Sequence, residues 1–274
     1  MHKKLLAWVA LSAFAMILSL GAYAQQVPGS IKALRVTGSV SVTHGDGTTE
    51  AVANNMTIAQ SDIVVTAKGA SVVLVFSNAS TINLGDDSRL EIKTYLTDPF
   101  SQAINVGAAT EEPMATTTAL NLTYGELVGN VKKLKSTSTY SVQTPVGAAG
   151  IRGTIFRIVF RPTGTGQAFF AVSTVDGEVI YTGMTGTDLQ IPLGQEVTVT
   201  VEINDATGQV VGTPTVTSTT PISNEAMQAI QAAATQAAQE AAAVVISPPP
   251  PPEPPPPPPP PPQPNTTPGE GGAG

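Results

Sequence analysis

Apolar and polar positions alternate along most of the chain, and turn-forming residues interrupt the alternation about every ten residues. Between Val36 and Thr43, the valines and Gly38 fall on one face, while serines and threonines fall on the other. A period of two is typical of strands that bury one face. The pattern predicts an all-β body over residues 31–217, arranged either as a solenoid-like stack or as a two-sheet β roll, with a sandwich as the remaining alternative.

Valine-rich strands are predicted to begin after Gly38, Gly125 and Gly177. We therefore expect separate strands at 120–122 and 126–131, at 168–174 and 178–181, and a last strand at 210–216. The intervals between the glycines are unequal, so this is no fixed-period repeat, although stacked coils of similar shape would produce it. Residues 97–118 interrupt the regular succession of strands and turns. They contain two prolines and an acidic pair, and they predict a long surface loop.

The last part of the chain changes character twice. Residues 223–246 are rich in alanine and predict one helix, capped by Ser223 or Asn224, that packs lightly on the β body. Its apolar stripe comprises Met227, Ile230, Ala234, Ala237, Ala241 and Val244. Residues 247–274 are predicted to form a disordered tail whose proline run favours polyproline II, as a spacer or as the ligand of an aromatic-lined groove.

The first 24 residues have the layout of a secretory signal peptide. A basic start with Lys3 and Lys4 precedes the apolar run from Leu5 to Leu20, and cleavage is expected between Ala24 and Gln25. An uncleaved anchor is the alternative. Cleavage predicts a periplasmic or secreted protein with no stable transmembrane segment. Because the chain contains no cysteine, neither a disulfide nor a lipid-modified cysteine is available.

The net charge and the residue types exclude several classes of function for this protein. The net charge of −7 becomes −9 once the two lysines leave with the signal, which disfavours nucleic acid as a partner. His44 is the only histidine after the signal, and no nucleophile motif or calcium loop occurs. The acidic pairs Asp86-Asp87 and Glu111-Glu112 are expected to be solvated in turns. We therefore predict no catalytic residue, no metal site, no cofactor and no enzyme activity.

The segment from Tyr140 to Phe156 holds the most informative motif. A strand ends in Thr144-Pro145, small residues follow, and Ile151-Arg152-Gly153-Thr154-Ile155-Phe156 opens the next strand. This motif resembles the signature of the FecR-type domain family, with Ile151 in place of a valine. With its flanking strands, the resemblance covers about residues 55–182. The signature residues, taken as structural or partner-binding, are Thr144, Pro145, Gly150, Ile151, Arg152, Gly153, Thr154 and Phe156.

The resemblance implies an extracytoplasmic domain that binds other proteins. In the family's best-known setting the domain follows a cytoplasmic segment and a membrane helix, whereas here a signal peptide leads directly into the β region. We therefore expect an exported, non-catalytic module that binds a protein or a cell-envelope component. The alternatives are a structural surface or matrix component and an accessory part of an envelope signalling system. Arg152 either ties neighbouring carbonyls or an acid together, or binds an anionic group of the partner.

Overall fold

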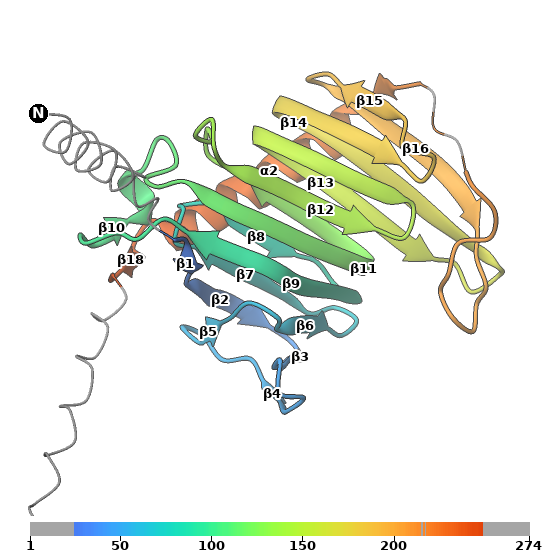
Figure 1. Cartoon of the computed structure of the whole chain (residues 1–274). Helices are drawn as coiled ribbons and strands as arrows, with labels where there is room; N and C mark the ends of the chain where they lie inside the picture. Colours follow the sequence, from blue (N-terminus) through green and yellow to red (C-terminus); the bar gives the residue numbers. More distant parts are fainter. Residues whose placement is uncertain (1–24, 215, 217, 249–274) are drawn as a thin grey trace, which may run out of the picture.

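The computed structural model describes residues 25–214, 216 and 218–248, and consists mostly of strands with one helix near the C-terminus (Figure 1). A single 16-stranded sheet is folded over on itself into two layers, and a second sheet of two strands lies beside it. The expected signal peptide and most of the expected proline-rich tail lie outside the described residues. Across the described part, none of the helices combines the length and the apolar character needed to span a membrane.

The two layers share three long strands, each of which contributes one half to either layer. These strands are β11 (Thr116–Asn130), β13 (Gly147–Pro162) and β14 (Gln167–Gly183). We name the layers by their outer faces. The covered layer also contains β5 (Thr57–Ile58), β2 (Ile31–Thr37), β7 (Ser71–Phe76), β8 (Thr81–Leu84), β16 (Gln195–Glu202) and β17 (Thr220–Pro221). The open layer also contains β4 (Thr49–Ala51), β3 (Val40–Thr43), β6 (Ile63–Thr66), β9 (Ser88–Thr97), β12 (Thr139–Thr144) and β15 (Asp188–Ile191), and β1 (Val27–Pro28) pairs with β9.

Glycines stand where the long strands cross from one layer to the other. β13 bends at Gly153, whose φ is +60°, and β14 bends beside it at Gly177, whose φ is +75°. A Cβ on Gly177 would clash with the carbonyl oxygen of Gly153, so the two corners are in contact. β11 changes partners at Gly125 in the same way. The separate strands predicted on either side of Gly125 and Gly177 are therefore single bent strands, because glycine permits a sharp bend without ending the strand pairing.

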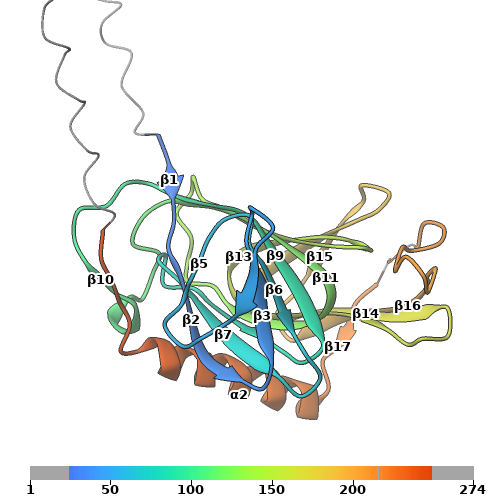
Figure 2. The same cartoon turned by 90° about the horizontal axis from the view of Figure 1, so that it is seen from below.

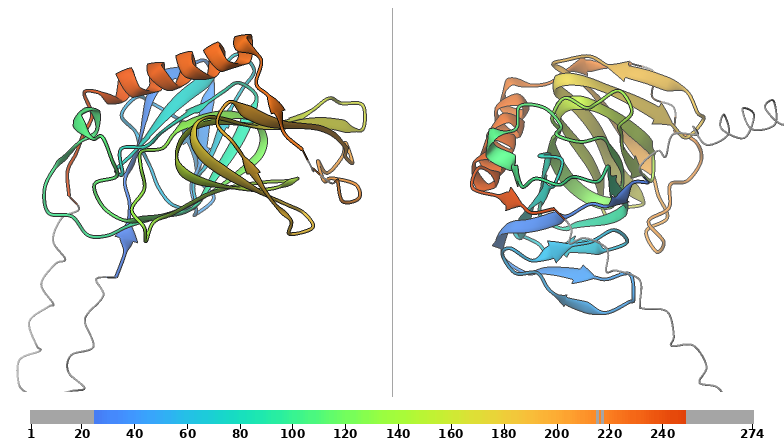
Figure 3. Two further views of the ribbon diagram at one scale, coloured as in Figure 1. Left: turned by 90° about the horizontal axis from the view of Figure 1, so that it is seen from above. Right: turned by 60° about the vertical axis from the view of Figure 1, so that its left-hand side comes forward.

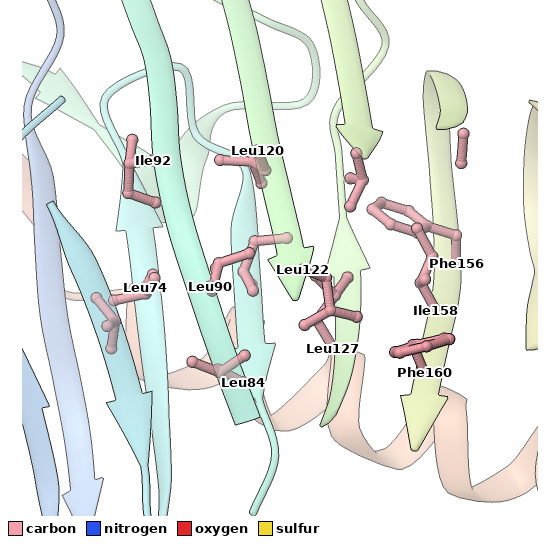
Figure 4. Close-up of a cluster of buried hydrophobic side chains, with 14 of the residues drawn as sticks. Leu74, Leu84, Leu90, Ile92, Leu120, Leu122, Leu127, Phe156, Ile158 and Phe160 are labelled. Carbon is pink, nitrogen blue, oxygen red and sulfur yellow. The ribbon is translucent and has the colours of Figure 1, made fainter. Parts of the chain in front are cut away.

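The main core lies between the layers. Leucines, isoleucines and phenylalanines from β7, β8, β9, β11 and β13 point into the same interior (Figure 4). The arrangement confirms the predicted all-β class and is that of a two-sheet β roll. Two local details differ from the expected pattern. The alternation from Val36 to Thr43 does not form one strand, because Gly38, with φ of +70°, turns the chain between β2 and β3, although the valine-rich strand β3 does begin after this glycine as predicted. In the described part of 210–216, Val210 makes only an isolated bridge to Ile203.

The helix α2 (Asn224–Ala241) lies along the outer face of the covered layer (Figures 2 and 3). Ser223 caps it by accepting a hydrogen bond from the Ala226 amide at 3.2 Å. Its buried residues are Ile230, Ala234, Ala237 and Ala241, which confirms the core of the predicted stripe. They pack on apolar outward residues of the sheet such as Val73, Val75 and Val128.

The helix ends five residues before the expected boundary at 246. β18 (Val245–Ile246) pairs instead with β10 (Ile104–Asn105), with Ile104 opposite Ile246. The β-branched residues at the end of the predicted helix favour this extended pairing. The loop predicted at 97–118 is also more structured than expected, because it contains β10 and the 3₁₀ turn η1 (Val106–Ala108) and joins β11 at Thr116.

Candidate partner-binding surface

The first signature residues build the hairpin between β12 and β13. Pro145 and Val146 form a two-residue turn, with Thr144 opposite Gly147 in the strand pairing. The Thr144 hydroxyl donates to the Gly147 carbonyl at 2.8 Å and accepts from the Val146 amide at 3.3 Å. The fixed φ of proline suits this turn. Thr144 and Pro145 therefore shape the backbone.

Ile151 and Phe156 belong to the core between the layers. Ile151 is 2% exposed and Phe156 is fully buried. The Phe156 ring meets Tyr140 edge-on, with centroids 6.4 Å apart, and lies over Gly129, where a Cβ would clash with it. Burial of such an aromatic side chain is among the larger contributions to a core. These two signature residues stabilise the roll.

Gly153 and Thr154 form the corner of β13. A Cβ on Gly153 would come within 2.8 Å of the Lys133 Cα, so the neighbouring chain packs closely against the corner. The buried Thr154 hydroxyl donates to the Asp176 carbonyl at the corner of β14, and the Val131 amide donates to the Thr154 carbonyl at 2.9 Å. These residues join the corners of neighbouring strands.

The two other signature residues, Gly150 and Arg152, face outward on the open layer. They alternate along β13 with Ala149 and Ile151, which are buried. Arg152 is exposed, and its guanidinium makes no hydrogen bond or ion pair to any other described residue. Glu178 stands opposite Arg152 in the strand pairing, but its carboxylate accepts a hydrogen bond at 2.9 Å from Gln190 on the far side.

A shallow groove of about 450 Å³ continues this surface towards the hairpin. Its lining contains hydroxyl and amide side chains and no titratable group. The lining residues are Asn121, Thr123, Gln143, Thr144, Pro145, Gly147, Ala148, Thr182 and Gly183. In Figure 1 the strands of this surface lie in front and α2 lies behind the sheet. The groove therefore opens on the face that the helix does not cover.

The acidic pairs lie elsewhere. Asp86 forms an ion pair with Arg161 at 3.1 Å, and Asp87 has a φ of +45° in the same turn. Glu111 is exposed, as expected. Glu112 corrects the expectation of a solvated pair, because it is only 1% exposed.

Four hydrogen-bond donors hold the Glu112 carboxylate. The Lys135 amide and the Ser138 hydroxyl donate to Oε2 at 2.9 and 2.6 Å, and the Thr116 hydroxyl and the Asn78 amide group donate to Oε1. These donors come from segments that are far apart along the chain, so no local sequence pattern indicated the cluster. A carboxylate saturated with donors is stabilised in place and has little capacity left for a ligand.

His44 also has partners that the sequence did not indicate. Its Nδ1 lies 3.1 Å from Oδ1 of the buried Asp62, and its Nε2 lies 2.9 Å from Oε1 of Glu50. The hydrogen bond with Glu50, followed by that with Asp62, raises the His44 pKa above its ordinary value of 6.5. Within the described ranges, no set of three or more histidine, aspartate or glutamate side chains is arranged to hold a metal ion.

The sequence indicated the signature residues but not the surface to which they belong. The contrast between the two outer faces depends on where α2 lies, and alternation along single strands cannot show this. One signal was present in β7, where Val72 to Phe76 are apolar without interruption. A strand that is buried on both faces has this pattern.

The chain was compared with curated proteins and with solved structures. No curated protein matches it. Two crystal structures of a candidate anti-sigma factor from Parabacteroides distasonis, at 1.65 and 2.50 Å, are similar to it, each with 12% sequence identity and a TM-score of 0.37. Each alignment covers 54% of this chain, and the chain spans 57% of the length of those structures.

A family model described as FecR protein matches residues 62–180. This range falls within the expected 55–182 and contains every signature residue from Thr144 to Phe156. The range contains β11 and β13 in full and most of β14, with their corners at Gly125, Gly153 and Gly177, so the match spans parts of both layers. Residues 62–180 of this chain form a FecR domain.

Proposed function

We propose that this protein is an exported, non-catalytic FecR module that binds a protein or cell-envelope partner through the outer face of its open layer. The single observation that carries the proposal is the asymmetry of the roll. α2 packs on one outer face, while the other face displays Gly150 and Arg152 from the FecR signature. The FecR domain itself supports an accessory role in envelope signalling.

The composition of the open face suits binding more than catalysis. Its outward positions near the signature include Ser141, Gln143 and Thr182, which offer hydrogen-bond donors and acceptors without a nucleophile–base pair. Ile180, 39% exposed, adds an apolar contact in the same region. Interfaces combine such apolar contacts with a polar rim.

Site-specific photo-cross-linking tests the proposal. A photoreactive residue is placed at Gln143 on the open face or at Gln231 on α2, and each protein is mixed with envelope extract. Both positions are exposed, so they are matched in accessibility. We expect a defined cross-linked product from the open face only. No product from either position, or the same products from both, would contradict the proposed function.

The structural alternative predicts a different outcome in the same samples. A surface or matrix component would sediment as large assemblies, and its cross-links would join copies of this chain. We expect a particle of defined size that contains one different partner. Sedimentation before and after cross-linking separates these outcomes.

A further inference from the structure

We infer that the open face recognises an extended peptide segment of the partner that carries an acidic side chain and, two residues away, an apolar side chain. The inference rests on the proposed function and specifies the chemistry of the partner. It is carried by three outward rows of side chains on β12, β13 and the second half of β14.

Arg152 provides the site for the acidic side chain. Its guanidinium is exposed and has no described partner, while the neighbouring Glu178 is engaged by Gln190. A planar guanidinium binds a carboxylate through two parallel hydrogen bonds. The lining of the adjacent groove is uncharged, and the nearby carboxylates of Glu178 and Asp188 accept hydrogen bonds from Gln190 and Thr182. The Arg152 guanidinium is therefore the cationic group beside the groove that can bind a carboxylate of the ligand.

Gly150 and Ile180 provide the site for the apolar side chain. Gly150 lies between Ser141 and Ile180 in the strand pairing, and its own position above the sheet is empty. Neither conformation nor packing demands glycine here, because Gly150 is not among the residues with positive φ and an added Cβ would meet only the Ile180 carbonyl at 3.6 Å. The fold leaves this space free beside an isoleucine that is 39% exposed.

The spacing between these two sites defines the ligand pattern. Arg152 and Gly150 are two residues apart on β13, which corresponds to about 6.6 Å along a strand. An extended ligand lying along β13 presents its side chains i and i+2 with the same spacing. Farther along, Gln143, Ala148 and Thr182 line the groove, where amide and hydroxyl groups can bond to the ligand backbone.

Short synthetic peptides are the probe. An acetylated hexapeptide amide with Glu and Leu two residues apart, in both orders in a Thr/Ser background, is titrated into the ¹⁵N-labelled protein. We expect shifts confined to the amides of the open face, including those of Ser141, Gly150, Arg152 and Ile180. Replacing the peptide Glu by Gln is expected to weaken binding about tenfold or more.

Matched protein variants sharpen the test. Arg152→Glu is expected to weaken binding about tenfold or more, whereas Lys68→Glu, the same charge change at an exposed turn between β6 and β7, leaves it unchanged. Gly150→Val is expected to abolish binding by filling the space beside Ile180. The denaturant midpoint of Gly150→Val must be at or above that of the parent protein. This control shows that the variant is folded and that its loss of binding has another cause.

Several results would overturn the inference. These are the absence of shifts on the open face, equal binding by the parent and Arg152→Glu, and tighter binding of an anionic oligosaccharide than of any peptide. If the protein with the photoreactive residue at Gln143 yields a cross-linked product while the peptides do not bind, only the inference about the peptide is wrong. If no cross-linked product is obtained either, the proposed function is wrong as well.

Discussion

The two outer faces of the roll belong to one folded sheet and share three long strands, yet their exposed surfaces differ in character. On the covered layer, outward residues such as Val73 and Val128 are buried beneath α2. On the open layer, outward residues such as Gln143 and Arg152 are exposed. The difference shows that a long strand can present buried outward residues at one end and exposed outward residues at the other, because a strand that bends between layers changes its surroundings.

The sharpest test places the same change on both faces. Val73→Asp puts an unpaired carboxylate beneath α2 and is expected to destabilise the protein by about 3–5 kcal/mol. Ile180→Asp, at an outward position 39% exposed, is expected to cost less than about 1 kcal/mol. Urea unfolding of the two variants measures the difference. Similar losses would mean that the open face is buried in the folded protein.

The next test concerns the buried Glu112. Glu112→Ala removes the acceptor for Ser138, Thr116 and the Lys135 amide, and is expected to destabilise the fold by about 1–3 kcal/mol. Glu111→Ala, on the exposed neighbour, is the control and should change stability by less than about 0.5 kcal/mol. Denaturant unfolding of the parent and both variants gives the midpoints from which the two stability changes are compared. Equal effects of the two substitutions would be inconsistent with the described cluster.

A smaller effect of opposite sign is expected on the open face. Gly150→Val should stabilise the protein by about 0.5–1 kcal/mol, because glycine within a strand loses more conformational freedom on folding and valine favours strands. Gly153→Val, at a corner with φ of +60°, should destabilise it instead. Thermal unfolding compares the pair. A loss of stability in Gly150→Val would show that the space above Gly150 is needed by the fold.

The smallest effect concerns pH. His44 has a folded-state pKa raised above 6.5, mainly through Glu50 and then Asp62. Its contribution to stability is therefore fully present below about pH 6.5 and is lost as the pH rises through the folded-state pKa. The stability difference between the parent and His44→Asn should shrink between pH 6 and pH 8.5. A difference that stays constant would mean that protonation of His44 does not stabilise this corner of the open layer.

Much of the architecture followed from local pattern. Alternation predicted the strands, the expected strand end at Thr144-Pro145 is that of β12, and the spacing of Ile230, Ala234, Ala237 and Ala241 predicted which helix face is buried. The strand boundaries at Gly125 and Gly177 were wrong for a physical reason. A glycine that ends a strand and a glycine that bends it look the same in sequence, and strand pairing on either side distinguishes them.

The sequence by itself determined the all-β class, the single C-terminal helix and the FecR signature, because each depends on residues that are close along the chain. Only the tertiary structure decided which residues of that signature are buried and which lie on the surface. Ile151, Gly153, Thr154 and Phe156 build the core and the corners, whereas Gly150 and Arg152 remain on the surface. That division depends on which layer α2 covers and on which distant segments surround each strand. These are long-range contacts, and they are specified by packing, not by the order of residues within the motif.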